Sequence, residues 1–281
     1  MSLQPPEYAK TVSNTREELN ERIDAITKFT SRPYFNKALK KLALECLDNA
    51  TIICDYITAE QNEINIKPST IEGKIKVLIW LWNFQHGKPF NLLTRQDILS
   101  YLNSLRKSID KDPTQKWIGS YNGRQMILLK FFKWLYNSEE IDQKQRITPP
   151  CMNGIKKLQR KQKTPYRHSD IWDAREHAIF LNYCPDIRDK CYHAMANDMS
   201  ARPHEILNLK ISDIKFKITI EGNQYADVVI KDGKTGPRTV PSIDSIPYVK
   251  EWIKSHPHGA NSDAWLFVPR GKKNIRSEVD L

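Results

Sequence analysis

The chain has 281 residues, of which 40% are hydrophobic and 27% charged, enough for two domains that each bury a core. No run approaches the roughly 20 apolar residues that a membrane-spanning helix needs, so we expect no membrane partner. Lysine and arginine number 44 against 33 aspartate and glutamate residues, and the resulting charge of +11 favours a polyanionic partner.

The start of the chain and its cysteines favour a cytoplasmic protein. The first residues, Met-Ser-Leu-Gln-Pro-Pro-Glu, have neither the basic nor the apolar segment of a secretory signal. The five cysteines are odd in number and form no Cys-x-x-Cys pair, so neither a disulfide framework nor a zinc site is predicted.

Helical periodicity dominates the first half of the chain. Thr15 and Glu18 have the spacing of a capping box, and so do Thr94 and Asp97. Apolar positions recur at helical spacing behind these caps and between them. Helices are therefore expected over residues 19–26, 39–57, 71–82, 98–105 and 120–137.

The last of these helices carries both aromatic and basic residues. Its aromatic side chains, and those of residues 80 and 82, are expected in a core rather than as platforms for stacked bases. The basic residues Arg124, Lys130 and Lys133 fall on the remaining face, where they are available to solvent or to phosphate.

A basic segment follows Pro149-Pro150. Residues 156–167, with the sequence KKLQRKQKTPYR, contain six cations and no acid. Two interpretations remain open: a solvated linker, or a connector that neutralises the phosphates of duplex DNA without reading its sequence. The candidate DNA contacts in this segment are Lys156, Lys157, Arg160, Lys161 and Lys163.

The second half of the chain mixes helices with strands. Helices are expected over residues 169–183 and from Pro185, and a further helix follows Arg202. The apolar period then drops to two over residues 216–220 and 226–230, and Asp232-Gly233 signals a tight hairpin before a third strand at residues 238–241. A helix from Ser245 and a short buried strand over residues 264–268 complete the pattern. The fold class predicted is mainly α with a small antiparallel sheet.

The stretch around Arg202 is the candidate site for an anion. Arg202 stands directly before a helix that begins near Pro203, where backbone N–H groups favour negative charge. Glu205 falls on the same face three residues later and is placed to hold the guanidinium. The alternative is an ordinary surface pair of arginine and glutamate, which contributes little.

The elements after Arg202 add a resemblance to a family. The spacing from Arg202 through Glu205 to Asp213, followed by a meander whose second hairpin reads Gly-Lys-Thr-Gly-Pro-Arg-Thr-Val-Pro over residues 233–241, resembles the catalytic domain of tyrosine recombinases, the phage integrase family of site-specific integrases. The resemblance implies a SAM-like helical core-binding domain at residues 61–148, a basic linker at 149–168 and a catalytic domain at 169–281. Residues 1–60 are expected to form a helical extension or arm.

The resemblance also implies a chemistry without metal or cofactor. A tyrosine attacks the scissile DNA phosphate, and cations around that phosphate lower the barrier. Arg202 matches the first catalytic arginine of the family. Lys234 matches the hairpin lysine that protonates the leaving 5′-oxygen, with Lys231 as the alternative. The implied partners are duplex DNA and other recombinase protomers on that DNA, with no small-molecule substrate. The resemblance also implies a mobile element, while the choice between integration, excision and dimer resolution stays open.

The sequence departs from the family pattern in its second half. The glycine that usually stands two residues before the arginine is Ser200, and no histidine is followed three residues later by arginine. Tyr248 is the last tyrosine, and it precedes the place where the missing boxes belong. Two alternatives follow: a recombinase that is C-terminally incomplete in this chain, or a catalytically inactive DNA-binding remnant or regulator.

Overall fold

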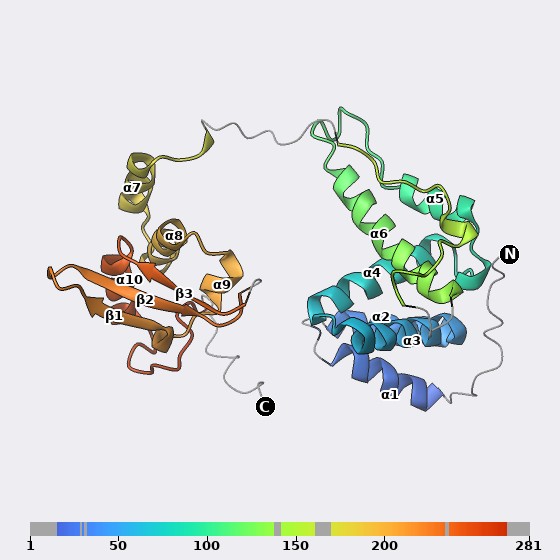
Figure 1. Ribbon diagram of the computed structural model, residues 1–281, viewed down its shortest axis with the longest axis horizontal. Coiled ribbons are helices and arrows are strands. Elements are labelled where there is room, and N and C mark those ends of the chain that lie inside the picture. The colour runs from blue at the N-terminus through green and yellow to red at the C-terminus, as the bar shows by residue number, and fades with distance from the viewer. Residues whose placement is uncertain are drawn as a thin grey trace. The chain divides into compact units, whose positions relative to one another are not determined.

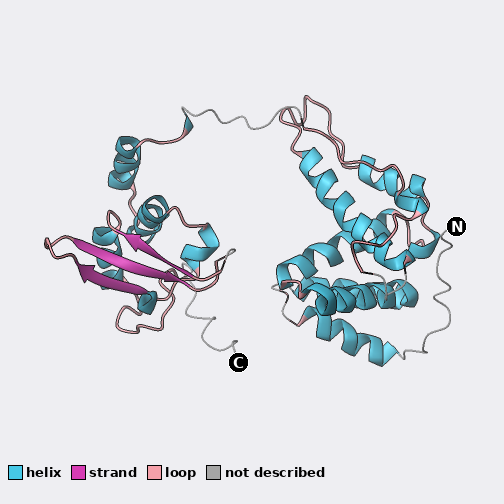
Figure 2. Ribbon diagram, viewed as in Figure 1, coloured by secondary structure: helices cyan, strands magenta, loops and turns pink. Residues whose placement is uncertain are grey.

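The computed structural model describes residues 16–28, 30, 33–137, 142–160, 170–233 and 236–268 (Figure 1). The chain divides into two compact units, Met1–Pro165 and Tyr166–Leu281. The described part of the first unit is helical, and the second combines helices with a small sheet (Figure 2). The predicted fold class, mainly α with a small antiparallel sheet, is confirmed.

The helices of the first unit enclose one hydrophobic core. That core takes in Leu19, Ile53, Leu78, Phe131 and Met152, so the helices before residue 61 share it with the later ones. The elements are α1 (Arg16–Thr27), α2 (Pro33–Glu45), α3 (Leu47–Ile64), α4 (Pro68–Phe84), the 3-10 turn η2 (Phe90–Leu92), α5 (Arg95–Asn103), α6 (Trp117–Tyr136) and the 3-10 turn η3 (Pro150–Met152).

Two helix predictions in this unit have different outcomes. The capping box of Thr94 and Asp97 is confirmed at the start of α5. The single helix predicted over residues 39–57 is wrong, because Cys46 adopts an extended conformation (φ −150°, ψ 92°) and separates α2 from α3. The break allows α2 to pack against α3. Because Cys46 is itself apolar, the helical spacing of apolar residues continues across the break, and the sequence pattern does not reveal it. Thr15 lies outside the described residues.

The second unit places a three-stranded antiparallel sheet, in the order β1-β2-β3, against two of its helices. Val228 pairs with Ile214 on one side and with Val240 on the other. Helices α8 and α10 pack against each other and against β3 and β2 respectively. The elements are α7 (Ala174–Tyr183), α8 (Ile187–Met199), α9 (Pro203–Leu207), the 3-10 turn η5 (Ile211–Asp213), β1 (Ile214–Ile218), β2 (Gln224–Ile230), β3 (Arg238–Ser242) and α10 (Ile246–Ser255).

Several boundaries in this unit differ from expectation. The helix predicted over residues 169–183 begins at Ala174, because Asp173 caps it, and the helix expected from Pro185 begins at Ile187. Residues 264–268 form no strand: Trp265 makes one isolated bridge, to Lys210. On β1 only Ile214 is buried, so the apolar side chains of Phe216 and Ile218 stay outside the core.

Candidate nucleic-acid interface

Glu205 holds Arg202 at the start of α9. One carboxylate oxygen of Glu205 accepts the backbone N–H of Arg202 at 3.0 Å, and the other accepts a terminal guanidinium N–H of Arg202 at 3.0 Å. The Glu205 side chain is fully buried, whereas the Arg202 side chain is 46% exposed. The structure therefore brings together the two residues that the i, i+3 spacing paired. Helix α9 has only five residues, so its dipole contributes less to an anion site than the sequence argument assumed.

A second arginine binds the same carboxylate. Arg238, the first residue of β3, donates from its two terminal nitrogens to the two oxygens of Glu205 at 2.7 and 3.2 Å. These bonds, together with those from Arg202, hold the pKa of Glu205 well below its usual value of 4.5, against the opposing effect of burial. Two guanidinium charges against one carboxylate leave this cluster with a net charge of +1, which favours an anionic ligand.

The two candidate lysines of the hairpin stand differently. Lys234 lies outside the described residues. The ammonium group of Lys231 lies 2.6 Å from Asp213, and this bond raises the pKa of Lys231. Asp213 is buried and also accepts the backbone N–H of Lys210 at 2.9 Å.

Gly233, which follows β2, lies close to Arg238. The carbonyl of Gly233 accepts the N–H of Gly236 at 3.0 Å. A Cβ atom on Gly233 would lie 2.3 Å from the carbonyl oxygen of Gly236 and 2.8 Å from a terminal nitrogen of Arg238. Only glycine fits at this position without moving one of them.

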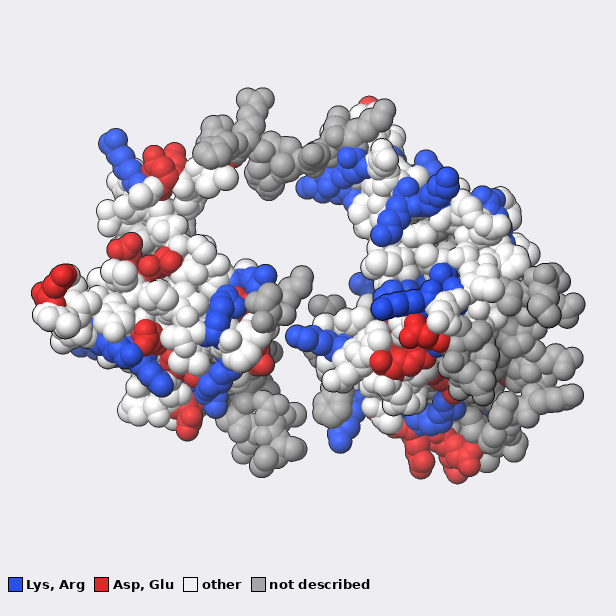
Figure 3. Space-filling model, in the orientation of Figure 1, with Lys and Arg blue, Asp and Glu red and all other residues white. Residues whose placement is uncertain are grey.

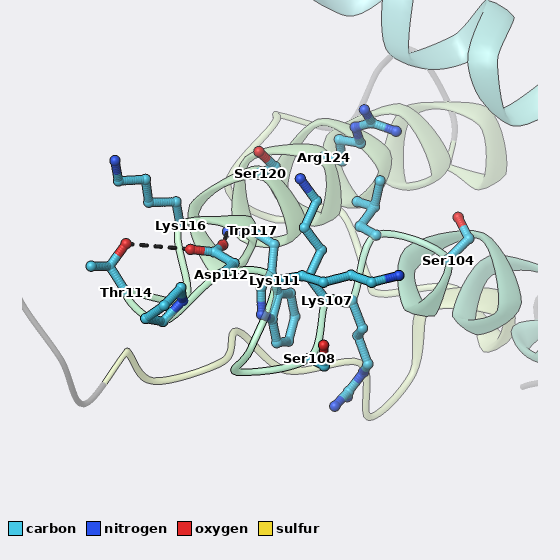
Figure 4. A pocket seen from close by; sticks show the side chains of 13 residues that line it. Ser104, Lys107, Ser108, Lys111, Asp112, Thr114, Lys116, Trp117, Ser120 and Arg124 are labelled. Carbon is cyan, nitrogen blue, oxygen red and sulfur yellow. Dashed lines mark hydrogen bonds between the residues drawn. The ribbon is translucent and has the colours of Figure 1, made fainter.

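The first unit carries a basic hollow, which we define by five cations: Arg106, Lys107, Lys111, Lys116 and Arg124 (Figure 4). The hydroxyl side chains of Ser104, Ser108, Thr114 and Ser120 also line it. Within the described ranges, none of the five cations forms an ion pair with a carboxylate. Figure 3 shows lysine and arginine side chains gathered over the part of this unit that holds α5 and α6.

The one acid of the basic hollow is occupied elsewhere. Asp112 accepts the backbone N–H of Trp117 at 3.0 Å and the hydroxyl of Thr114 at 3.3 Å, so it satisfies the start of α6 instead of a lysine. The hollow consequently keeps an excess of positive charge, together with the hydroxyl groups of Ser108 and Ser120, as the surface of a phosphate-binding groove requires.

Arg124 is held in place by aromatic side chains. It donates to the hydroxyl of Tyr101 at 2.9 Å, and its guanidinium lies 4.2 Å from the centre of the Trp80 ring. Lys76 lies 4.4 Å from the centre of the same ring. Trp80 is only partly buried and carries cations, whereas Trp82 and Phe131 are buried, as expected for core residues.

The other predicted DNA contacts are dispersed. Lys130 is exposed on α6 and Lys133 is half-buried there. Lys156 and Lys157 are exposed, and Arg160 donates to the backbone oxygen of Thr114 at 2.7 Å, beside the basic hollow. Lys161 and Lys163 lie outside the described residues.

The beginning of the basic segment is bound to α6. Gln125 donates to the carbonyl of Ile155 at 3.0 Å, and the Asn122 side chain exchanges hydrogen bonds of 2.8 and 2.9 Å with the backbone of Leu158. These bonds fix residues 155–158 along the helix, so the cations beside them are presented from an ordered backbone.

Sequence reasoning missed Arg238 and four cations of the basic hollow. Arg238 is 33 residues from Glu205, and its role depends on the fold. Arg106, Lys107, Lys111 and Lys116 stand in a stretch that also contains two aspartates, so counting charge along the chain hid them. Within the described residues, no group of three or more His, Cys, Asp or Glu side chains is arranged to hold a metal ion, and no helix is long and apolar enough to cross a membrane.

No protein family model matches the chain, and no curated protein does. Solved structures that are similar to the chain include two complexes of one recombinase. The XerH site-specific recombinase bound to difH substrate, a pre-cleavage complex, aligns with a TM-score of 0.50 and 13% identity over 96% of this chain and 78% of that chain. Its post-cleavage complex with palindromic difH substrate gives a TM-score of 0.48 and 13% identity over 95% and 76%. The likeness to the pre-cleavage complex is one of fold, and with the mainly helical architecture and small antiparallel sheet it makes this chain consistent with a tyrosine recombinase fold.

Proposed function

We propose that the chain binds duplex DNA and acts in site-specific DNA recombination or integration by tyrosine-mediated phosphoryl transfer. Its own residues supply the DNA clamp and the first half of the active site. The observation that carries the proposal is the cluster of Arg202, Glu205 and Arg238, in which a half-exposed guanidinium is held rigidly with net positive charge. The fold and the basic hollow support the same partner.

The proposal assigns a role to each part of the chain. Residues 61–148 act as the core-binding domain, residues 1–60 extend it through the shared core, residues 149–168 are the basic linker, and residues 169–281 belong to the catalytic domain. In the first unit, the five cations of the basic hollow bind phosphates and fix the position of the protein on DNA. Other protomers of the recombinase bind the same DNA.

In the second unit Arg202 holds the non-bridging oxygens of the scissile phosphate. A guanidinium suits this task because it donates two parallel hydrogen bonds in a fixed plane. Lys234 supplies the proton for the leaving 5′-oxygen, and the cations together stabilise the charge of the transition state without a metal or cofactor.

A second candidate function is DNA binding without cleavage, in a remnant or regulator. It is suggested by the given sequence, in which no histidine is followed three residues later by arginine. Both candidates require DNA binding, and they differ in whether Arg202 and Lys234 take part in phosphoryl transfer.

A nicked suicide substrate tests the proposal. The chain is incubated with the nicked duplex, and covalent protein–DNA complexes are separated under denaturing conditions, while binding is measured in parallel by fluorescence anisotropy. We expect salt-dependent binding and no covalent band, because the residues that match the nucleophile and its partners are not in this sequence. A covalent band would show that this chain contributes its own nucleophile. Loss of all binding at low salt would overturn the clamp itself.

A further inference from the structure

The charge of the Arg202 cluster depends on a residue that is not expected to touch DNA. Arg202 and Glu205 alone form a neutral pair. Arg238 adds the second positive charge, and its 33% exposed side chain uses both terminal nitrogens on the Glu205 carboxylate.

The division of hydrogen bonds leaves Arg202 available. Arg202 gives Glu205 one backbone N–H and one guanidinium N–H, and Arg238 gives the same carboxylate two. Within the described residues, the remaining guanidinium nitrogens of Arg202 have no hydrogen-bond partner. Because Arg238 donates to both oxygens of Glu205, this carboxylate has little capacity to accept further hydrogen bonds from the remaining guanidinium nitrogens of Arg202.

We propose that Arg238 is a positioning residue, which neutralises Glu205 so that Arg202 keeps both its free donors and a net positive charge for a DNA phosphate. This inference rests on the proposed function. Arg238 acts through Glu205 and touches no reacting atom. Without Arg238, the charge of Glu205 repels a phosphate and attracts the free donors of Arg202.

Arg238 also connects the cluster to the hairpin. Gly233 lies so close to it that an added Cβ atom would stand 2.8 Å from an Arg238 terminal nitrogen. Gly233 therefore lies beside the same guanidinium that neutralises Glu205.

A comparison of single and double variants in the full chain tests this role, because the second substitution restores the net charge of the cluster. The affinity for a mixed-sequence duplex of about 30 base pairs is measured against salt concentration for wild type, Arg238→Gln and the double variant Glu205→Gln/Arg238→Gln. We expect Arg238→Gln to lower the slope of log K against log salt by about one, because one phosphate contact is lost. The double variant leaves Arg202 unopposed, so its slope should return toward that of wild type.

Three further measurements make the outcome decisive. Lys217→Gln is the matched control, because it removes the same charge from an exposed ion pair with Asp227 in the same sheet, and its slope should stay at the wild-type value. Arg238→Lys keeps the charge and loses the two-pronged bond, so the proposal predicts a slope close to that of wild type. Circular dichroism melting identifies any variant that does not fold, and if Arg238→Gln is one of these, Arg238→Lys decides.

The results separate failure of the inference from failure of the proposed function. Absence of wild-type binding would refute the proposed function. If wild type binds but the double variant is no better than Arg238→Gln, Arg238 is only a structural residue and the inference is wrong. The same conclusion follows if folded Arg238→Lys has a slope lower than that of wild type by about one.

Discussion

Lys231 donates to Asp213 across 2.6 Å, and Asp213 in turn accepts the backbone N–H of Lys210 at the start of η5. This ion pair joins the end of β2 to the segment that precedes β1. A lysine engaged there has to break a bond to a buried carboxylate before it reaches a DNA strand. This engagement of Lys231 supports our proposal that Lys234 takes the role of the hairpin lysine.

The hairpin lysines are predicted to differ in DNA binding. Lys234→Ala should lower the salt slope of DNA binding by about one, because a phosphate contact is lost. Lys231→Ala serves as the matched variant from the same hairpin and should keep the wild-type slope. The measurement is anisotropy with a labelled duplex over a range of salt concentrations. If Lys231→Ala lowered the salt slope and Lys234→Ala kept the wild-type slope, the role would belong to Lys231.

The basic hollow predicts a larger effect in the first unit. Lys107→Ala/Lys111→Ala should lower the salt slope by about two, since each lysine is counted as one phosphate contact, and should leave the melting temperature unchanged. The double variant Lys40→Ala/Lys41→Ala removes the same charge from α2 and is the control. Equal losses in the two double variants would mean that net charge, and not the hollow, determines binding.

Glu205 predicts a pH dependence of local stability in the second unit. Its pKa in the folded protein lies below the usual value of 4.5, so the ionised form stabilises the fold above that pH, and the contribution is lost as the pH falls below 4.5 toward the native value. Amide hydrogen exchange in β2 and β3 should show wild type better protected than Glu205→Gln at neutral pH, with the difference shrinking as the pH falls below 4.5. A difference that stays constant over this range would contradict the account.

A buried ion pair in the first unit predicts a strong effect on stability. The ammonium group of Lys74, on α4, contacts the carboxylate of Glu60, on α3, and both side chains are at most 5% exposed. Burial lowers the pKa of Lys74, and the bond to Glu60 opposes that shift. Lys74→Met should lower the free energy of unfolding by about 3–5 kcal/mol, because it leaves a buried carboxylate unpaired.

A double variant shows whether Lys74→Met is destabilising because it leaves the Glu60 carboxylate unpaired or because it changes side-chain packing. Glu60→Leu/Lys74→Met replaces both charges with apolar groups and should recover most of the stability lost in Lys74→Met. Urea unfolding followed by circular dichroism measures both variants. A double variant less stable than Lys74→Met would show that the pair contributes more than mutual neutralisation.

The sequence allowed the local part of the site to be predicted, but not its long-range part. Arg202 and Glu205 are three residues apart at the start of one helix, so a helical spacing argument pairs them. Arg238 reaches Glu205 only because the sheet brings the first residue of β3 beside α9. Cys46 interrupts a helix although its neighbours keep the apolar period, because packing of α2 on α3 overrides local preference.

The basic hollow shows the same limit for charge. Asp112 stands among lysines in the sequence and would be counted as their partner. In the structure it satisfies the first turn of α6, and the lysines remain without a carboxylate in the described part of the chain. Whether an acid neutralises a neighbouring cation depends on which groups donate hydrogen bonds to its carboxylate. The amino-acid composition contains no information on these partners.

The salt dependence of DNA binding by Arg202→Gln, compared with wild type, tests the central claim most directly. Between about 50 and 200 mM salt the wild-type affinity for duplex DNA should fall steeply, as it does when several phosphates are neutralised by lysine and arginine. Arg202→Gln should fold, bind more weakly and show a slope lower by about one. Wild-type binding that does not change with salt, or an Arg202→Gln slope equal to that of wild type, would contradict the assignment of Arg202 as a phosphate-holding residue.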